Sequence, residues 1–317
     1  MFHRDLSSFL ALCLIWGTTW IGITIGIERV PAVMFAGTRF TAAGILLIVI
    51  LSCRDGLQLP DRQSGVRLAI VSVLSITLCY GPMFWGMNHV SSGTAAVLEM
   101  SMTPVALLCF AIGLREEAWS AARFAAVAIG VVGLSILFLP DTVSAGEEGT
   151  SWLPILGAAA VTWAAISSAF GSILARPLMA AQSSAYIAAW TNLIGGLVLV
   201  LGSLIFEEGA AASLTEIWEW EAFAAWAYLV VFGSLIGYTI YMRLIRDVGS
   251  RAGSFAFVSP VIAVTIGVVF NSETVTILDI CGMILMLGAA YFSMRGSDGV
   301  TLEGPAPQSA TKISSET

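Results

Sequence analysis

Arg39 and Glu99, two side chains of opposite charge, each interrupt a long apolar stretch, FAGTRFTAAGILLIVIL (35–51) and TAAVLEMSMTPVALL (94–108). A charge at the centre of a membrane-spanning helix costs about 2.5–3.5 kcal/mol, and such residues usually face a partner or a wet cavity. We therefore expect Arg39 to meet Glu99 or the carboxylate of a bound solute, and Glu99 to be a candidate for proton exchange. The alternatives are an ion pair that only fixes helix register and an arginine that extends outward to the lipid interface.

Aromatic residues with a polar tip recur at matching places in the two parts of the chain. Trp16 matches Trp163, and Tyr80 matches Tyr238. Such side chains suit a pocket for small amphipathic solutes, whereas ordinary packing against the core or the lipid is the alternative. The candidate binding residues are completed by Phe84 and Ser259.

Pro104 and Pro260 fall inside two of the apolar stretches. A proline removes one backbone hydrogen bond of a helix and frees a carbonyl, so a bend at either residue could serve gating or binding. A kink that is merely tolerated is the alternative.

The sequence lacks the motifs of several other site types. It has no GxxxxGK[ST] loop for a nucleotide phosphate, no HExxH and no Ser–His or paired-aspartate arrangement, and its two histidines lie near the ends of apolar stretches. The five cysteines occur singly, without metal-ligand spacing, and are interpreted as packing residues. We therefore expect no enzyme activity, no metal, no cofactor, no ATP and no nucleic acid.

The elements that must position these residues follow from composition. The 317 residues are 57% hydrophobic and 11% charged, and the mean hydropathy is +0.89. A soluble domain carries about a quarter charged residues, and the apolar stretches lack the alternation of an outer-membrane barrel. The sequence therefore predicts an all-α polytopic membrane protein.

Ten transmembrane helices are expected when the chain is divided at prolines, glycines and charge clusters. They cover 7–27, 32–52, 66–87, 93–113, 120–139, 152–174, 184–206, 223–245, 251–271 and 276–295. Every Lys and Arg other than Arg29 and Arg39 then falls at the face that carries the N-terminus. The excess of basic residues places both termini in the cytoplasm. The polar tail, 297–317, is expected to be disordered and cytoplasmic.

The chain also contains an internal repeat, with one half in 1–140 and the other in 141–296. YGPMFWGMNHVSSGTAAVLEMSMTP (80–104) corresponds to YTIYMRLIRDVGSRAGSFAFVSP (238–260), and each segment is followed by an acidic residue, Glu117 or Glu273. Five spans in each half make the second half enter the membrane in the inverted orientation. Inverted repeats are the physical basis of alternating access around a site near the midplane, although a duplication that only enlarged the bundle is the alternative.

These features resemble the EamA-type transporters of the drug/metabolite transporter superfamily. The resemblance rests on WGTTW (16–20), Arg39, VSSGTAAVLEMSMTP (90–104) and the acidic turns after the fourth and ninth spans, and the layout covers nearly the whole chain. It implies an inner-membrane carrier of small metabolites, often an exporter of amino acids or related compounds, with a cavity lined by spans 1, 3, 4, 6, 8 and 9. The turns read REE and NSE where the family often has Gly-Glu, so the roles of these carboxylates stay open.

The sequence thus predicts a secondary transporter in the bilayer of the cell inner membrane. One arginine and one glutamate in an aromatic cavity suit an amino acid or a related zwitterionic or amphipathic solute, and efflux and proton coupling are hypotheses. An intramembrane enzyme and a non-transporting assembly subunit are the alternatives, and the oligomeric state is open.

Overall fold

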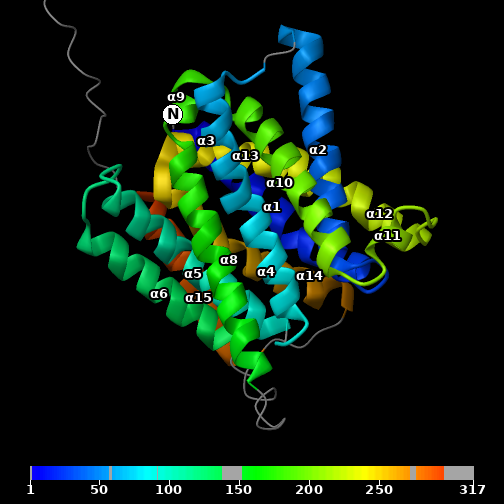
Figure 1. Cartoon of the computed structure of the whole chain (residues 1–317). Coiled ribbons are helices and arrows are strands. Elements are labelled where there is room, and N and C mark those ends of the chain that lie inside the picture. Colours follow the sequence, from blue (N-terminus) through cyan, green and yellow to red (C-terminus); the bar gives the residue numbers. More distant parts are fainter. Residues whose placement is uncertain (1, 57–58, 91, 138–151, 272–275, 296–317) are drawn as a thin grey trace, which may run out of the picture.

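The computed structural model describes residues 2–56, 59–90, 92–137, 152–271 and 276–295. Regular structure within these ranges is helical throughout. The helices pack into one bundle, with α6 and α15 at one edge and α11 and α12 at the opposite edge (Figure 1). The predicted tail, 297–317, and the acidic residue Glu273 lie outside the described residues.

The described residues of the first half form six α-helices and one π-helical stretch. They are α1 (Phe2–Ile27), α2 (Ala32–Asp55), α3 (Arg62–Ser72), the π-helical stretch Val73–Thr77, α4 (Leu78–Met87), α5 (Ser92–Gly113) and α6 (Ala121–Leu137). Because the π-helical stretch directly joins α3 to α4, these three elements make up a single continuous span.

The second half has the same kinds of element. They are α8 (Leu153–Ala175), α9 (Leu178–Ala181), α10 (Ser184–Phe206), α11 (Ala210–Ser213), α12 (Trp220–Tyr228), the π-helical stretch Leu229–Gly237, α13 (Tyr238–Val248), the 3-10 turn Gly249–Ser254, α14 (Phe255–Asn271) and α15 (Ile277–Arg295). A π-helical stretch thus interrupts the third span of each half.

Seven helical segments of the described residues are long and apolar enough to cross a membrane. They are Asp5–Ile27, Ala32–Arg54, Arg62–Met87, Ala95–Gly113, Leu153–Ala181, Ser184–Phe206 and Trp220–Ile262. Two shorter apolar helices, Ala121–Ile136 and Ile277–Ser293, coincide with the predicted spans 120–139 and 276–295. The prediction of an all-helical membrane protein is confirmed, whereas the number of ten spans stays a prediction.

The seventh segment covers the predicted span 223–245 and residues 251–262 of the predicted span 251–271, and a loop was expected between the two spans. At 1.5 Å per residue it would be about twice as long as the bilayer core is thick if it were straight. However, α13 ends at Val248, because the next residue, Gly249, has a φ of +63° that cannot continue an α-helix. A 3-10 turn takes the place of the expected loop.

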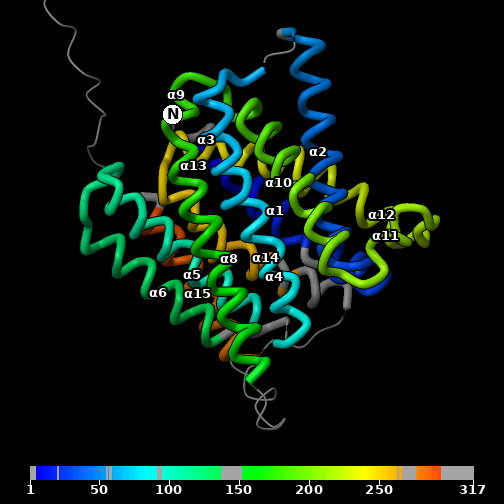
Figure 2. Tube along the Cα trace, in the orientation of Figure 1, coloured from blue at the N-terminus to red at the C-terminus, as the bar shows by residue number. Residues whose placement is uncertain are grey.

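The main contacts between helices are equivalent in the two halves: a helix of one half contacts the helices that correspond to the partners of its counterpart in the other half. In the first half α1 packs against α12, α13 and α14, and in the second half α8 packs against α3, α4 and α5. The second spans of the two halves, α2 and α10, also pack against each other, as do the last ones, α6 and α15 (Figure 2). The arrangement is consistent with two related halves, while the boundaries 1–140 and 141–296 stay a prediction.

Small residues allow α2 and α10 to approach closely. A Cβ atom at Gly44 would collide with the backbone of Leu193, and one at Gly196 would collide with the backbone of Thr41. Because lipid provides no hydrophobic force between helices, close packing through small residues is what holds such pairs together.

Candidate functional site

A cavity lies in the middle of the bundle, between helices of both halves. It leaves about 90 Å³ for the centres of water molecules, which is room for several waters. Its lining residues are Trp16, Thr19, Ile23, Arg39, Ser75, Cys79, Tyr80, Met83, Glu99, Met100, Thr103, Ser168, Gly233, Tyr238, Tyr241, Phe255 and Ser259. α1, α2, α4, α5, α8, α13, α14 and both π-helical stretches contribute to the wall.

Six of the eight predicted binding residues line this cavity. They are Trp16, Arg39, Tyr80, Glu99, Tyr238 and Ser259. Phe84 is fully buried beside the cavity, and its ring contacts the ring of Tyr80 at a centroid distance of 5.9 Å. Phe84 therefore packs behind the wall, and its role in solute binding stays a prediction.

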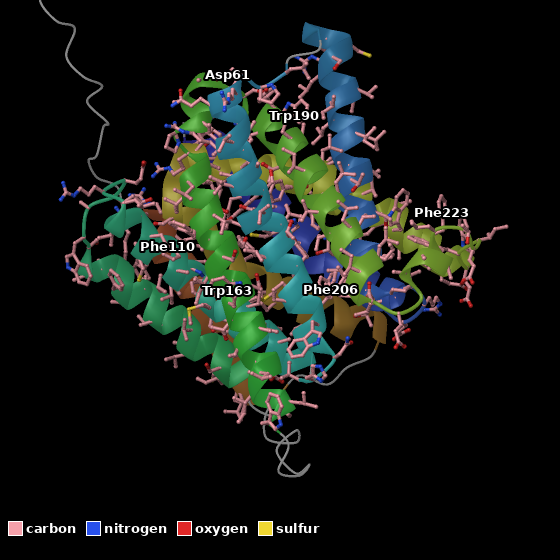
Figure 3. The ribbon with its side chains drawn as sticks, viewed as in Figure 1. Asp61, Phe110, Trp163, Trp190, Phe206 and Phe223 are labelled. Atoms are coloured by element: carbon pink, nitrogen blue, oxygen red, sulfur yellow. The ribbon has the colours of Figure 1, made fainter. Side chains whose placement is uncertain are left out.

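Trp163 is the exception among the predicted residues. Its side chain is 50% exposed on the outside of α8 and does not line the cavity (Figure 3). Trp163 therefore does not occupy a place equivalent to that of Trp16, and its role in solute binding stays a prediction. The reason is rotational: on a helix, a shift of one or two positions between repeats turns a side chain from the inner face to the outer face.

Arg39 is almost completely buried, with 3% of its surface exposed. Its guanidinium carbon lies 4.3 Å from the centroid of the Phe40 ring and 5.3 Å from that of Tyr80, within the range of cation–π interactions. Its Nε has no hydrogen-bond partner among the described residues. The aromatic faces thus stabilise the charge, while one donor stays free at the cavity wall.

Glu99 lies on the cavity wall formed by α5. Its Oε1 accepts a hydrogen bond from Thr103 Oγ1, one helical turn further on, at 3.3 Å. The ion pairs found in the described ranges do not join Arg39 to Glu99. The expected direct pair is thus not formed in this structure, and the two charges instead face a shared cavity.

An aromatic wall on the second half faces α1. The ring centroid of Trp16 lies 4.6 Å from that of Phe255 and 5.1 Å from that of Tyr241. Tyr241 is fixed in place by a 2.9 Å hydrogen bond between its hydroxyl and that of Ser172. The sequence interpretation missed Phe255 and Tyr241, although Tyr241 lies three positions after Tyr238 and therefore on the same helical face.

Each π-helical stretch lines the cavity and accepts a hydrogen bond from the opposite half. Ser167 Oγ of α8 donates to the carbonyl of Leu74 at 2.8 Å, and Trp16 Nε1 of α1 donates to the carbonyl of Gly233 at 3.3 Å. π-Helical turns are rare and often mark functional sites. The first span of each half therefore binds the irregular part of the third span of the other half.

Two buried hydroxyl groups add polarity to the cavity wall. Ser75 Oγ and Tyr238 Oη lie close to each other, and neither makes a well-formed hydrogen bond in the part of the chain that the structure describes. A buried polar group that is poorly bonded is costly. Water or a bound solute would therefore compete with the weak contact between these two hydroxyl groups.

The two predicted bending residues lie within helices but not on the cavity wall. Pro104 lies inside α5, and Pro260 lies inside α14 directly after the cavity residue Ser259. Their role in gating stays a prediction. Among the described residues, no group of three or more His, Cys, Asp or Glu side chains is placed to hold a metal ion.

Known proteins resemble this chain over nearly its whole length. The model of the EamA-like transporter family matches residues 6–139 and 155–295. An uncharacterized inner membrane transporter of Escherichia coli (strain K12), YedA, is 34% identical over 294 residues, which cover 90% of this chain and 88% of YedA. An uncharacterized transporter of Bacillus subtilis (strain 168), YoaV, is 25% identical over 89% of this chain and 94% of YoaV.

A solved structure titled only "Crystal structure of protein" shares the fold. It superposes with a TM-score of 0.75 at 17% identity and covers 92% of this chain and 96% of the other. The helical bundle, the apolar segments and the match of the family model to both halves agree with one another. The chain is a membrane transporter of the drug/metabolite type and belongs to the EamA-like transporter family.

Proposed function

We propose that the protein is a secondary transporter that carries a small zwitterionic solute, an amino acid or a close relative, through the central cavity. The observation that carries this proposal is the placement of Arg39 and Glu99 on α2 and α5, around one cavity and without a direct bond between them. A guanidinium binds a carboxylate, and a carboxylate binds an ammonium group. A solute that carries both groups can therefore satisfy both walls at once.

The lining favours a solute with an apolar or aromatic side chain. Trp16, Tyr241 and Phe255 form a wall of rings next to the charged residues, and such rings bind apolar groups over a large area. Amphipathic neutral solutes remain within the proposal, because the same wall would bind them without the charges.

Alternating access is the proposed mechanism. Helices of both halves line the cavity, and contacts between helices are preserved when the halves are exchanged. Two packings of related halves would expose the cavity to one side of the membrane at a time. The location in the inner membrane, the cytoplasmic termini, efflux and ten spans belong to the same proposal.

Proton coupling through Glu99 is part of the proposal. Glu99 lines the cavity, and among the described residues the Thr103 hydroxyl alone donates a hydrogen bond to it. A proton and the ammonium group of a solute would therefore compete for the carboxylate oxygens of Glu99. Competition of this kind makes the transport of the solute depend on the transport of the proton in the opposite direction.

Uptake of a panel of labelled amino acids into proteoliposomes, with and without a pH gradient, tests the proposal. We expect transport of at least one apolar or aromatic amino acid, with a rate that depends on the gradient. Glu99→Gln should abolish that dependence, whereas Trp163→Phe, outside the cavity, should keep the rate and the dependence of the wild type. A panel without any transported amino acid contradicts the proposed solute class, and gradient dependence in Glu99→Gln contradicts the coupling.

A further inference from the structure

A set of polar contacts joins the two halves at the end of the bundle where α5 ends. Glu117, four residues after α5, belongs to the first half, and Ser250, in the 3-10 turn between α13 and α14, belongs to the second. Glu117 Oε1 accepts a hydrogen bond from the backbone N–H of Ser250, and Oε2 accepts one from Ser250 Oγ, both at 2.7 Å. Both oxygens of the Glu117 carboxylate thus accept hydrogen bonds from Ser250, a residue of the opposite half.

Two arginines complete this set. Arg123 Nη1, at the start of α6, donates to Glu117 Oε2 at 2.5 Å. Arg176 Nη1, directly after α8, lies 3.2 Å from Glu116 Oε2 and 3.9 Å from Glu117 Oε1. Since the side chain of Glu117 is only 11% exposed, water screens these interactions much less than it would screen a surface pair.

The backbone is shaped for this contact on both sides. On the first half, the N–H groups of Glu116 and Glu117 both donate to the carbonyl of Ala111, at 2.8 and 3.0 Å, which turns the chain back over the end of α5. On the second half, Gly249 has a φ of +63°, and a Cβ atom there would collide with Glu117 Oε1. The φ angle therefore requires a glycine at this position, and a larger residue would also have to displace the end of the Glu117 side chain.

An apolar layer lies between these polar contacts and the cavity. A Cβ atom at Gly253 would lie 2.7 Å from Leu107 Cδ1 and 3.2 Å from Pro104 Cα. The 3-10 turn is therefore tightly packed against α5 at Gly253. Along the first half, the order is Glu99 at the cavity, then Pro104 and Leu107, then Glu117. Along the second half, the order is Ser259 at the cavity, then Gly253, then Ser250.

The two segments therefore run side by side in opposite chain directions from the cavity to the end of the bundle. We define the N-side seam as Pro104, Leu107 and Glu117 on one segment and Ser250 and Gly253 on the other. By the alternation of the helices, this end of the bundle carries the N-terminus. A solute that leaves the cavity between these two segments must separate the N-side seam.

We propose that the N-side seam is the gate that closes the cavity on the side of the N-terminus, and that the Glu117 carboxylate holds it shut. This inference rests on the proposed alternating access. When the seam separates, Ser250 loses the acceptor of its N–H, and Glu117 keeps Arg123 of its own half as a partner. In the open state, hydrogen bonds to water therefore replace the hydrogen bonds between Glu117 and Ser250, and the Glu117 carboxylate is still paired with Arg123.

Cys79 is a native reporter for this gate, because its side chain lines the cavity and is 5% exposed. In a variant that keeps Cys79 and has alanine at Cys13, Cys53, Cys109 and Cys281, a membrane-impermeant maleimide is applied in proteoliposomes from the side of an N-terminal epitope tag. The initial rate of labelling measures how often the cavity is open to that side. No solute is needed, so a failed search for a transported amino acid leaves this test intact.

Glu117→Gln should raise the rate of Cys79 labelling from the N-terminal side about tenfold, since hydrogen bonds to a charged acceptor are lost. Asp247→Asn is the matched control. Asp247 lies on the same side of the membrane and carries the same charge, but its partners, Arg243 and Arg246, belong to its own helix. An unchanged labelling rate in Glu117→Gln, or an equal rise in Asp247→Asn, overturns the proposal.

A milder variant and a cross-link keep the test open if Glu117→Gln fails to fold. Ser250→Ala removes only the hydroxyl contact and should raise the labelling rate about threefold. With cysteines at 117 and 250 alone, a reversible bifunctional methanethiosulfonate should stop transport, and a reductant should restore it. Full transport by the cross-linked protein, or no rise in Ser250→Ala, contradicts the gate.

Discussion

Arg39 shows how a single residue in an apolar stretch can indicate a binding site. An arginine within an apolar helix needs compensation, and the sequence therefore predicts an anionic partner or a cavity. The structure supplies the cavity and two aromatic faces, whereas Glu99 lies on the wall without a bond to the guanidinium. Phe40, the nearer ring, is the sequence neighbour of Arg39, but the contact with Tyr80 could not be predicted from the sequence, because Tyr80 reaches Arg39 only through tertiary packing.

Arg39→Lys should lower the transport rate of a carboxylate-bearing solute by about tenfold or more, although the charge is kept. An ammonium group lacks the flat face that stacks on Phe40 and Tyr80 and the fork that binds a carboxylate through two bonds. Initial rates of uptake into proteoliposomes give the comparison. Arg39→Met should be inactive but folded, because it removes a buried charge together with its need for a partner. Wild-type uptake by Arg39→Met would exclude Arg39 from solute binding.

Trp16 and Trp163 show where repeat symmetry fails at the scale of one residue. The sequence match placed both in the cavity, but only Trp16 lines it, and Trp163 is half exposed. The symmetry between the halves is a good guide to which helices contact each other. It is a poorer guide to which side chain of a helix faces the cavity. At 100° per residue, a small shift in alignment is enough to move a side chain to the lipid-facing side.

The π-helical stretches are the elements that the sequence did not predict. Val73–Thr77 and Leu229–Gly237 contain no proline, and a π-helical turn differs from an α-helical one by a small change in hydrogen bonding that composition does not encode. Each stretch lies shortly before a cavity tyrosine, Tyr80 in the first half and Tyr238 in the second. A repeated irregularity next to the cavity points to a functional reason for the strain.

Ser167→Ala tests the support of the first π-helical stretch. Removal of the hydroxyl deprives the Leu74 carbonyl of its donor, so the free energy of unfolding should fall by about 1 kcal/mol. Amide hydrogen exchange of residues 73–77 should become faster. Thr162→Ala on the same helix is the control, since the Thr162 hydroxyl donates only to the carbonyl of Ala158 within α8. Equal protection of residues 73–77 in both variants would show that the Ser167 bond does not support the stretch.

Arg115 ends α5 in the left-handed region, with a φ of +61°. A residue other than glycine in this conformation is destabilised by roughly 1–2 kcal/mol relative to glycine, and glycine is the usual residue at such helix ends. Arg115→Gly should therefore raise the free energy of unfolding by roughly 1 kcal/mol, as measured by thermal unfolding in detergent. Arg115→Ala, which keeps the Cβ atom, is the control and should bring no gain. An equal gain in the alanine variant would assign the effect to the lost charge.

At the scale of the whole molecule, the sequence predicted the helical membrane class and most of the helices. The ends of α2 and α10, for example, lie within a few residues of the ends of the expected spans 32–52 and 184–206. The turn between α13 and α14 differs from expectation because Gly249 and a 3-10 turn replace a loop. What could not be predicted is which helices touch, since apolar helices of similar composition give no signal for their partners.

The contact between α2 and α10 is the most extensive contact between helices in the described part of the chain. Gly196 and Gly202 both lie on α10, but a Cβ atom at Gly196 would collide with the backbone of Thr41, whereas one at Gly202 would meet nothing within 4 Å. Backbone cannot move aside as the end of a flexible side chain can. The two glycines therefore form a matched pair for a test of helix packing.

Gly196→Leu should push α10 away from α2 and prevent the two halves from packing, because even overpacking by single methylene groups costs about 1–3 kcal/mol in a tight interior. Gly202→Leu adds the same side chain to the same helix and should leave the protein monodisperse, with a melting temperature close to that of the wild type. Size-exclusion chromatography and thermal unfolding in detergent compare the two variants. If Gly196→Leu behaves like Gly202→Leu, α2 and α10 are not held in contact by their small residues, and the close packing of the two halves must depend on other helices.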